Sequence, residues 1–196
     1  MIRVTEVLDY LTEPELLNWF ITKGKTACKK ISEESLRIGS AVDKLIQQDI
    51  KEHQYMVPNG ELAIANCLLA WEKFKKDYPS YISSIISIQC EAKDGEIVGH
   101  PDIELTDQID DIKTSRAIQP RYLTQTSKYA RMMNKHKIGI IRLDKETANY
   151  EYKQFGIDVI DYENLVFDAY LVAYKHNKII REIIRKQLEL EVLGVE

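Results

Sequence analysis

The feature that most constrains the fold is a change in the spacing of apolar residues near position 80. Before it, apolar side chains such as Leu36, Val42, Leu45 and Ile46 recur at helical spacing, which indicates helices with one buried face. After it, short runs rich in β-branched residues, such as 137–143, are typical of strands. Because helices come first and strands afterwards, we predict a mixed α/β fold with a central sheet.

The same patterns, with the signals for helix starts and turns, give the expected order of elements. We expect helices over residues 6–11, 32–51, 61–77, 120–134 and 162–192, the last being one long helix or a pair. A further helix start is predicted at residues 12–15, and residues 23–30 are predicted as a connection. We expect strands over residues 81–92, 96–105, 109–114, 137–143 and 148–155, with a hairpin turn at 93–95.

The composition is that of an ordered intracellular protein. Hydrophobic residues make up 44% and charged residues 30% of 196 positions, and neither a membrane-spanning run nor a secretory signal is visible. No repeat or linker interrupts the chain, so we predict a single domain with a mainly helical part (1–80), a sheet with its helix (81–155) and a C-terminal helical part (156–196).

Global charge and cysteine usage exclude some classes of site. Cys28, Cys67 and Cys90 are far apart without a CxxC pair, so we expect buried, reduced thiols rather than a zinc or iron–sulfur site. No glycine-rich phosphate loop is present, so ATP use is not expected. The net charge of −4 gives no general attraction for nucleic acid, so local basic clusters must supply any such contact.

The chemically informative segment contains Asp102, Asp111 and Lys113. Asp111 and Lys113 are two apart on a predicted strand, so their side chains share one face, and a neighbouring antiparallel strand can bring Asp102 beside them. Carboxylates hold Mg²⁺ or Mn²⁺, and a cation supports the charge that develops when a phosphodiester is hydrolysed. The alternative is an edge strand whose solvent-exposed face carries alternating charges, which would show the same sequence pattern.

Four motifs in order make the chain resemble the RecB-like branch of the PD-(D/E)XK nuclease superfamily, especially phage-type and mitochondrial-genome-maintenance-type exonucleases. They are Gly39-Ser40-Ala41-Val42-Asp43, Pro101-Asp102, Asp111-Ile112-Lys113 and Gln125-Thr126-Ser127-Lys128-Tyr129. The resemblance covers residues 3 to about 155. It implies a restriction-endonuclease-like fold: a mixed central sheet flanked by helices, with a helical N-terminal elaboration and a C-terminal helix.

The resemblance also implies roles for individual residues. Asp102, Asp111 and the Ile112 carbonyl would hold Mg²⁺ or Mn²⁺, while Lys113 would orient the attacking water and stabilise the transition state. Gln125 and Tyr129 would position the phosphate or support Lys113. Asp43 stands where the family has histidine, so it is either a substitute ligand or a residue on an exposed helix face. Glu91 is either the additional acid of many members or an exposed glutamate at a strand end.

Residues outside these motifs have weaker claims to the site. His100 is a ligand only if its strand is regular, and Asp110 should face away from Asp111, toward solvent or a salt bridge. Lys128, Arg131 and Lys135 fall at helical spacing beside Gln125. They are either contacts to the DNA backbone or a solvated helix face. Trp19, Phe20 and Tyr122 are candidates for stacking on bases, with core packing as the favoured alternative for Trp19.

We therefore expect a metal-dependent deoxyribonuclease, and the resemblance favours an exonuclease in recombination, repair or phage DNA processing. A strand- or structure-selective endonuclease is the alternative enzyme. A catalytically silent nucleic-acid-binding or assembly module on the same fold is the alternative of another class. DNA is the expected partner, RNA stays open, a membrane is not expected, and a homo-oligomer is possible.

Overall fold

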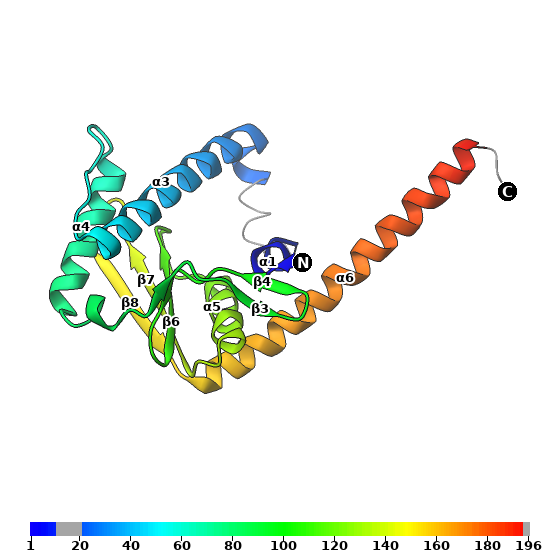
Figure 1. Ribbon diagram of the computed structural model, residues 1–196. Coiled ribbons are helices and arrows are strands. Elements are labelled where there is room, and N and C mark those ends of the chain that lie inside the picture. The colour runs from blue at the N-terminus through cyan, green and yellow to red at the C-terminus, as the bar shows by residue number, and fades with distance from the viewer. Residues whose placement is uncertain (11–20, 194–196) are drawn as a thin grey trace.

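The computed structural model describes residues 1–10 and 21–193 (Figure 1). The helices are α1 (Val4–Tyr10), α3 (Lys25–Glu52), α4 (Leu62–Asp77), α5 (Pro120–Met132) and α6 (Ile157–Leu193), with a 3₁₀ helix η1 (Ile82–Ser84). The strands are β1 (Ile2–Arg3), β2 (Ser87–Ile88), β3 (Ala92–Asp94), β4 (Ile97–Gly99), β5 (Ile103–Glu104), β6 (Gln108–Lys113), β7 (Lys137–Leu143) and β8 (Tyr150–Phe155). The predicted mixed α/β fold with flanking helices is confirmed. The helix start predicted at residues 12–15 and the stacking candidates Trp19 and Phe20 lie outside the described residues.

The central sheet has five strands in the order β2-β5-β6-β7-β8. β6 and β7 pair in parallel over their whole lengths, from Gln108 opposite Lys137 to Lys113 opposite Arg142, and the other neighbours pair antiparallel. A parallel pair requires a crossover connection, and α5 provides it. β6 therefore lies in the middle of the sheet with α5 packed against it.

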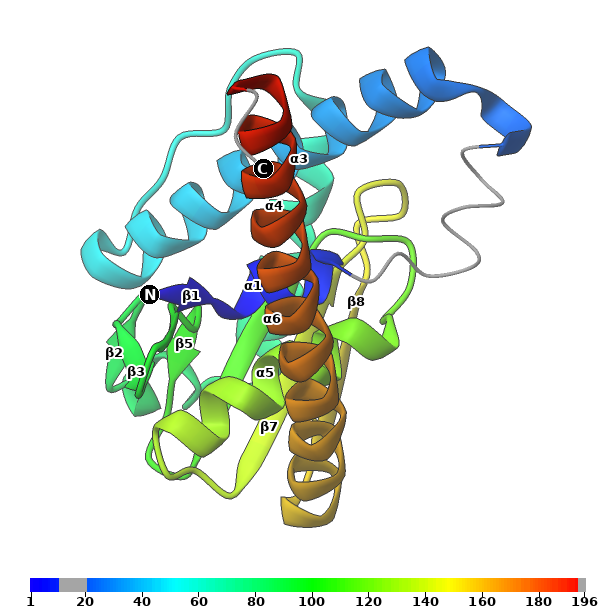
Figure 2. The same cartoon turned by 90° about the vertical axis from the view of Figure 1, so that its right-hand side faces the viewer.

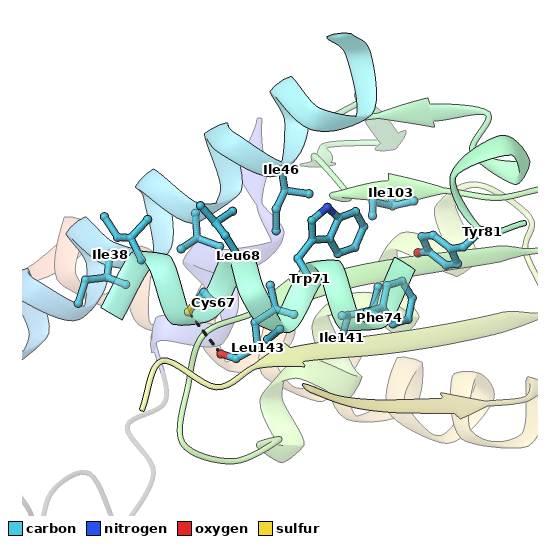
Figure 3. Close-up of a cluster of buried hydrophobic side chains, with 13 residues drawn as sticks. Ile38, Ile46, Cys67, Leu68, Trp71, Phe74, Tyr81, Ile103, Ile141 and Leu143 are labelled. Atoms are coloured by element: carbon cyan, nitrogen blue, oxygen red, sulfur yellow. Dashed lines mark hydrogen bonds between the residues drawn. The ribbon is translucent and has the colours of Figure 1, made fainter. Parts of the chain in front are cut away.

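Helices cover both faces of this sheet. On one face, α3 and α4 bury Trp71 and Phe74 against Ile141 and Leu143 of β7 (Figure 3). On the other face, α1, α5 and α6 form a second core that includes Phe167 with strand residues such as Ile109 and Ile138. Odd and even positions of β7 serve different cores because successive side chains of a strand point to opposite faces.

A smaller sheet has the order β1-β4-β3. β3 and β4 form the predicted hairpin, and Gly95 takes a φ of 57° at its turn, a conformation that glycine adopts without a steric penalty. β1 pairs in parallel with β4, which brings the start of the chain against the hairpin. The hairpin leads directly into the Pro101-Asp102 segment.

Two predicted strands are wrong in their extent. Residues 81–92 form η1 and the two-residue strand β2 rather than one strand, because Ser83 and Ser84 bond to nearby backbone carbonyls and compete with sheet pairing. Residues 96–105 are divided between β4 and β5, which belong to different sheets. Pro101 stands at the division, where it lacks a backbone N–H and restricts the residue before it.

Two helices are longer than predicted. α3 begins at Lys25, so residues 25–30 are helical and do not form a connection; they contain no proline or glycine, and Gly24 stands just before the helix. α6 is one helix that begins at Ile157, and its outer part projects from the rest of the molecule (Figure 1). Across residues 1–10 and 21–193, no helix has the length and apolar character needed to cross a membrane.

Candidate active site

The strand β6 carries the first two site residues on the face that packs against α5. Asp111 is 1% exposed, and its Oδ2 atom lies 2.6 Å from the Nζ atom of Lys113. The same oxygen is buried, so this ion pair is shielded from solvent. The strand alternation that the sequence predicted is therefore the reason why a carboxylate and an ammonium meet inside the protein.

Asp102 reaches this pair from the segment between β4 and β5. β5 pairs with β6 only at Ile103 and Glu104, and the Asp102 Oδ2 atom accepts a hydrogen bond from the Ile112 N–H at 2.8 Å. The Asp102 side chain thus continues the contacts of the short strand β5 along β6. This places its carboxylate beside that of Asp111.

Gln89 joins Asp102 to the helix α3, and the sequence analysis did not single it out. Its Nε2 atom donates to Asp102 Oδ1 at 2.8 Å and lies 3.5 Å from Asp43 Oδ1. The other Asp43 oxygen accepts from Gln47 at 2.8 Å. Gln89 has a φ of 50°, which costs energy for a residue with a side chain and is common where a site constrains the backbone.

The helix α5 covers the site with Gln125 and Tyr129, one turn apart. The Gln125 Oε1 atom accepts from Lys113 Nζ at 3.4 Å, and its Nε2 atom donates to the Tyr129 hydroxyl at 3.2 Å. Lys113 Nζ also lies 5.0 Å from the centre of the Tyr122 ring, a favourable cation–π position. Lys113 is therefore held by a carboxylate, an amide and an aromatic ring.

A glycine at the end of β4 makes room for the Tyr129 ring. A Cβ atom built on Gly99 would lie 2.2 Å from Tyr129 Cε1, well inside van der Waals contact. Gly39 of α3 is in ordinary contact with the next segment of the site, since its Cβ would lie 3.5 Å from Thr114 Oγ1. The glycine of the predicted Gly39–Asp43 motif therefore lies beside the end of β6.

The electrostatics of the site follow from crowding acids in a buried place. Burial raises the pKa of Asp111 to about 7, and the nearby Asp102 charge adds to this while Lys113 opposes it. Burial and the charge of Asp102 likewise raise the pKa of Asp43. Burial alone would lower the pKa of Lys113, but the charges of Asp111 and Asp102 raise it overall, so Lys113 stays an ammonium.

The donor set suits a hard cation in part. Asp102 and Asp111 are neighbouring carboxylates, and their oxygens contact the Ile112 N–H and the Lys113 ammonium. Oxygen ligands of this type are those that Mg²⁺ and Mn²⁺ prefer. Within residues 1–10 and 21–193, however, no three His, Cys, Asp or Glu side chains are grouped closely enough to hold a metal by themselves. A cation here would need the Ile112 carbonyl, water or substrate to complete its coordination.

Other candidate acids and histidines do not join the cluster. Glu91 forms an ion pair with Lys93 at 2.6 Å, and Gln89, two residues earlier, contacts the site carboxylates instead. His100 is exposed. Asp110 does face away from Asp111, as expected, but it is fully buried rather than in solvent or a salt bridge, and accepts hydrogen bonds from Tyr81, Tyr152 and Gln108. These donors stabilise a carboxylate that packing has enclosed between the sheet and α4.

The three basic residues predicted to contact DNA are engaged within the protein. Lys128 is nearly buried, pairs with Asp94 at 2.9 Å and lies over the Phe167 ring. Lys135 pairs with Glu104 at 2.8 Å, and Arg131 pairs with Asp161. Only Arg131 among the three keeps about half of its side chain exposed. The structure thus does not present Lys128 and Lys135 as free cations at the surface.

Comparisons with known proteins give a distant structural likeness. No protein-family model matches the chain, and no curated protein sequence matches it. An alkaline exonuclease from Laribacter hongkongensis is 13% identical with a TM-score of 0.48, over 96% of this chain and 94% of that one. The same exonuclease with dAMP is 11% identical with a TM-score of 0.47, over the same shares. A phage-related exonuclease from Haemophilus somnus 129PT is 13% identical with a TM-score of 0.40, over 93% and 96%. Scores this low do not by themselves assign an activity.

Proposed function

We propose that the chain is a nuclease that hydrolyses DNA phosphodiester bonds with the help of Mg²⁺ or Mn²⁺. The observation that carries this proposal is the buried Asp111–Lys113 pair on one face of β6, with Asp102 held against the same strand by the Ile112 N–H. Carboxylates beside a lysine are the groups that a phosphodiester hydrolase needs. The ordered sequence motifs support the same proposal.

In this proposal Asp102 and Asp111 hold the cation, with the Ile112 carbonyl as a further oxygen donor. A bound divalent cation would neutralise the phosphate and lower the pKa of a water nucleophile. Asp43 would act through Gln89, which contacts both Asp43 and Asp102. Asp111 must be ionised to bind a cation, and its pKa of about 7 means that protons compete for this oxygen at acidic pH.

Lys113 would bind the scissile phosphate and stabilise the negative charge that grows in the transition state. Its ammonium is already positioned by Asp111, Gln125 and the Tyr122 ring, so little reorganisation is needed during the reaction. Gln125 and Tyr129 would hold Lys113 in this position. We further propose that the enzyme acts from DNA ends, which the motif resemblance supports.

The test is a cleavage assay on end-labelled linear DNA and on circular DNA, each single- and double-stranded, with RNA of the same sequence included. Wild type, Lys113→Ala and the matched surface control Lys153→Ala are compared in Mg²⁺, Mn²⁺ and EDTA. We expect metal-dependent cleavage by wild type and Lys153→Ala, and a loss of at least about 100-fold in Lys113→Ala. Cleavage of the linear substrates but not the circles would support action from ends.

Two outcomes would count against the proposal. Cleavage that persists in Lys113→Ala at the wild-type rate would remove Lys113 from the reaction. No cleavage of any substrate, with wild type and Lys113→Ala binding DNA equally well, would instead favour the nucleic-acid-binding module.

A further inference from the structure

α6 has a second apolar stripe, on the side opposite the stripe that packs against the molecule. Ile160, Phe167 and Tyr174 are seven residues apart and buried. Leu165 and Val172 each stand two residues before a member of that set, yet they are 70% and 69% exposed. Two residues turn a helix by about 200°, so the exposed stripe faces away from the body of the protein.

The exposed stripe follows a heptad repeat over the described part of the helix. Leu165, Val172 and Ile179 occupy one apolar position of the repeat. Tyr162, Ala169, His176 and Ile183 occupy the other. Tyr162, Ile179 and Ile183 are 66%, 58% and 47% exposed. Alternating spacings of three and four residues are the pattern by which one helix packs along another.

The surroundings of the stripe leave it open to a partner. The side of α6 turned toward the viewer in Figure 2 is not covered by another helix or strand, and its outer part extends beyond α1 in Figure 1. The stripe contains five large apolar side chains that are about half exposed or more: Tyr162, Leu165, Val172, Ile179 and Ile183. Such a set is unusual on the surface of a protein that acts alone. The heptad spacing indicates that the partner which covers the stripe is a helix.

We propose that this stripe pairs with the same stripe of a second copy of the chain, as two antiparallel helices related by a two-fold axis. Two charges beside the central part of the stripe favour this occupant. Lys175 and Glu182 occupy the same flanking position of successive heptads, and such positions face each other in an antiparallel pair. Lys175 of each copy would therefore lie opposite Glu182 of the other, forming the same contact twice, as a two-fold interface requires.

A parallel pair would lack this complementarity. It would bring Lys175 opposite Ile180 and Glu182 opposite Gln187, and neither Ile180 nor Gln187 carries a charge. Lys175 already forms an ion pair with Glu96 of its own chain and keeps 41% of its side chain exposed, so it remains accessible to a second carboxylate.

The antiparallel register also matches the side chains in size. Val172 of one copy lies opposite Ile183 of the other, and His176 lies opposite Ile179. Lys186, the polar member of the repeat, lies opposite the small Ala169, which leaves room for the lysine stem. Because each body is attached to the far side of its own helix, the two bodies lie on the outside of the pair.

The experiment is sedimentation velocity of the full chain over a wide concentration range. Wild type should show a monomer–dimer equilibrium. Val172→Lys/Ile179→Lys should weaken the dimer by about a hundredfold or more, because both copies lose buried apolar contacts. The matched control is Leu36→Lys/Leu69→Lys, which changes two similarly exposed apolar residues (72% and 55%) on α3 and α4. Far-UV circular dichroism of each variant verifies that the fold is kept.

The register is tested by exchanging the flanking charges. Glu182→Lys should weaken the dimer, and adding Lys175→Glu should restore it; failure to restore would overturn the antiparallel register. A wild type that stays monomeric at every concentration overturns the proposal. Sedimentation of that monomer with anionic phospholipid vesicles would not rescue it, because the stripe would then contact lipid rather than a second copy. A dimer weakened equally by the control pair would overturn the assignment of the interface to this stripe.

Discussion

At the scale of single residues, the candidate site combines groups that disfavour folding with groups that hold them in place. Asp111 is buried with the acid Asp102 beside it, and the Lys113 ammonium holds one of its oxygens. Gln89 adopts an unfavourable backbone conformation while contacting Asp102. Such costs are typical of a site arranged for a ligand rather than for stability.

Asp111→Asn should stabilise the metal-free protein, increasingly so as pH rises. The folded-state pKa of about 7 exceeds 3.8, the ordinary pKa of an aspartic acid, so the stability contributed by protonated Asp111 is present below about pH 4 and lost as pH rises through 7. The neutral asparagine escapes this loss, and its advantage should reach about 2–4 kcal/mol above pH 7.

Urea unfolding in EDTA between about pH 4 and pH 8 measures this difference. The exposed residue change Asp168→Asn serves as the control and should show no such pH dependence. An Asp111→Asn advantage that is constant across the whole range would contradict the raised pKa. The same variant should lose cleavage, since it removes the proposed ligand.

Gly99→Ala should disturb the site through Tyr129. The new Cβ would lie 2.2 Å from the tyrosine ring, so the ring or β4 must move, at a cost of about 1–3 kcal/mol. Thermal unfolding and the cleavage assay measure the two effects. Gly156→Ala is the matched control, because a Cβ there meets nothing within 4 Å. Equal unfolding temperatures for both variants would show that the ring contact does not constrain the site.

At the scale of elements, polar contacts fix how the helices pack against one another and on the sheet. The α3 carboxylate Asp49 accepts a hydrogen bond from Trp71 Nε1 at 2.8 Å, and Lys75 Nζ lies 2.6 Å from the same oxygen. Both partners belong to α4, whose aromatic residues pack on the sheet (Figure 3). This contact orients α3, and with it Asp43.

Asp49→Ala should cost about 2–4 kcal/mol of folding free energy, because it leaves a buried indole N–H and a lysine without their acceptor. Asp49→Asn keeps an acceptor oxygen and should cost less. Urea unfolding of the two variants gives the comparison. If alanine costs no more than asparagine, the shared oxygen does not hold the two helices together.

Lys128 should behave as a packing residue of α5 rather than as a contact to DNA. Its side chain is 7% exposed and links Asp94 of the hairpin to Phe167 of α6. Lys128→Met should therefore lower stability by about 1–3 kcal/mol and leave DNA affinity unchanged. Urea unfolding and fluorescence anisotropy over a salt series measure both. A loss of affinity with a salt slope reduced by about one would instead make Lys128 a phosphate contact.

At the scale of the whole molecule, α6 serves two regions with one helix. Its first part closes the core beside α1 and α5, where Phe167 is buried and the Tyr174 hydroxyl contacts Glu6. Its outer part extends past that core (Figure 1). The buried and exposed stripes lie on opposite sides of the helix, so the packed and unpacked surfaces differ around the helix as well as along it.

A chain that ends after Lys178 should fold as stably as the full chain at concentrations where both are monomeric. The expected difference in unfolding free energy is within about 0.5 kcal/mol, because the packed stripe ends at Tyr174. A chain that ends after Val166 loses Phe167 and Tyr174 and should be destabilised by several kcal/mol, about 3 or more. Urea unfolding compares the three chains. Marked destabilisation of the chain that ends after Lys178 would show that the outer helix supports the core.

Local patterns determined much of the fold and the candidate site. β7 begins and ends where the sequence predicted, and α4 and α5 are close to their predicted ends, because apolar periodicity, proline and turn residues act over a few neighbouring positions. The shared face of Asp111 and Lys113 follows from strand alternation in the same way. So does the one-turn spacing of Gln125 and Tyr129.

Only the tertiary structure decided which residues meet across the chain. Gln89 contacts Asp102 because a bend after β2 turns it inward, and nothing in its local sequence distinguishes it from Glu91. Asp110 and Lys128 are buried because partners from distant elements surround them. Periodicity depends on neighbouring residues and could therefore be predicted from the sequence. Burial and charge pairing depend on contacts between segments far apart in the sequence and could not.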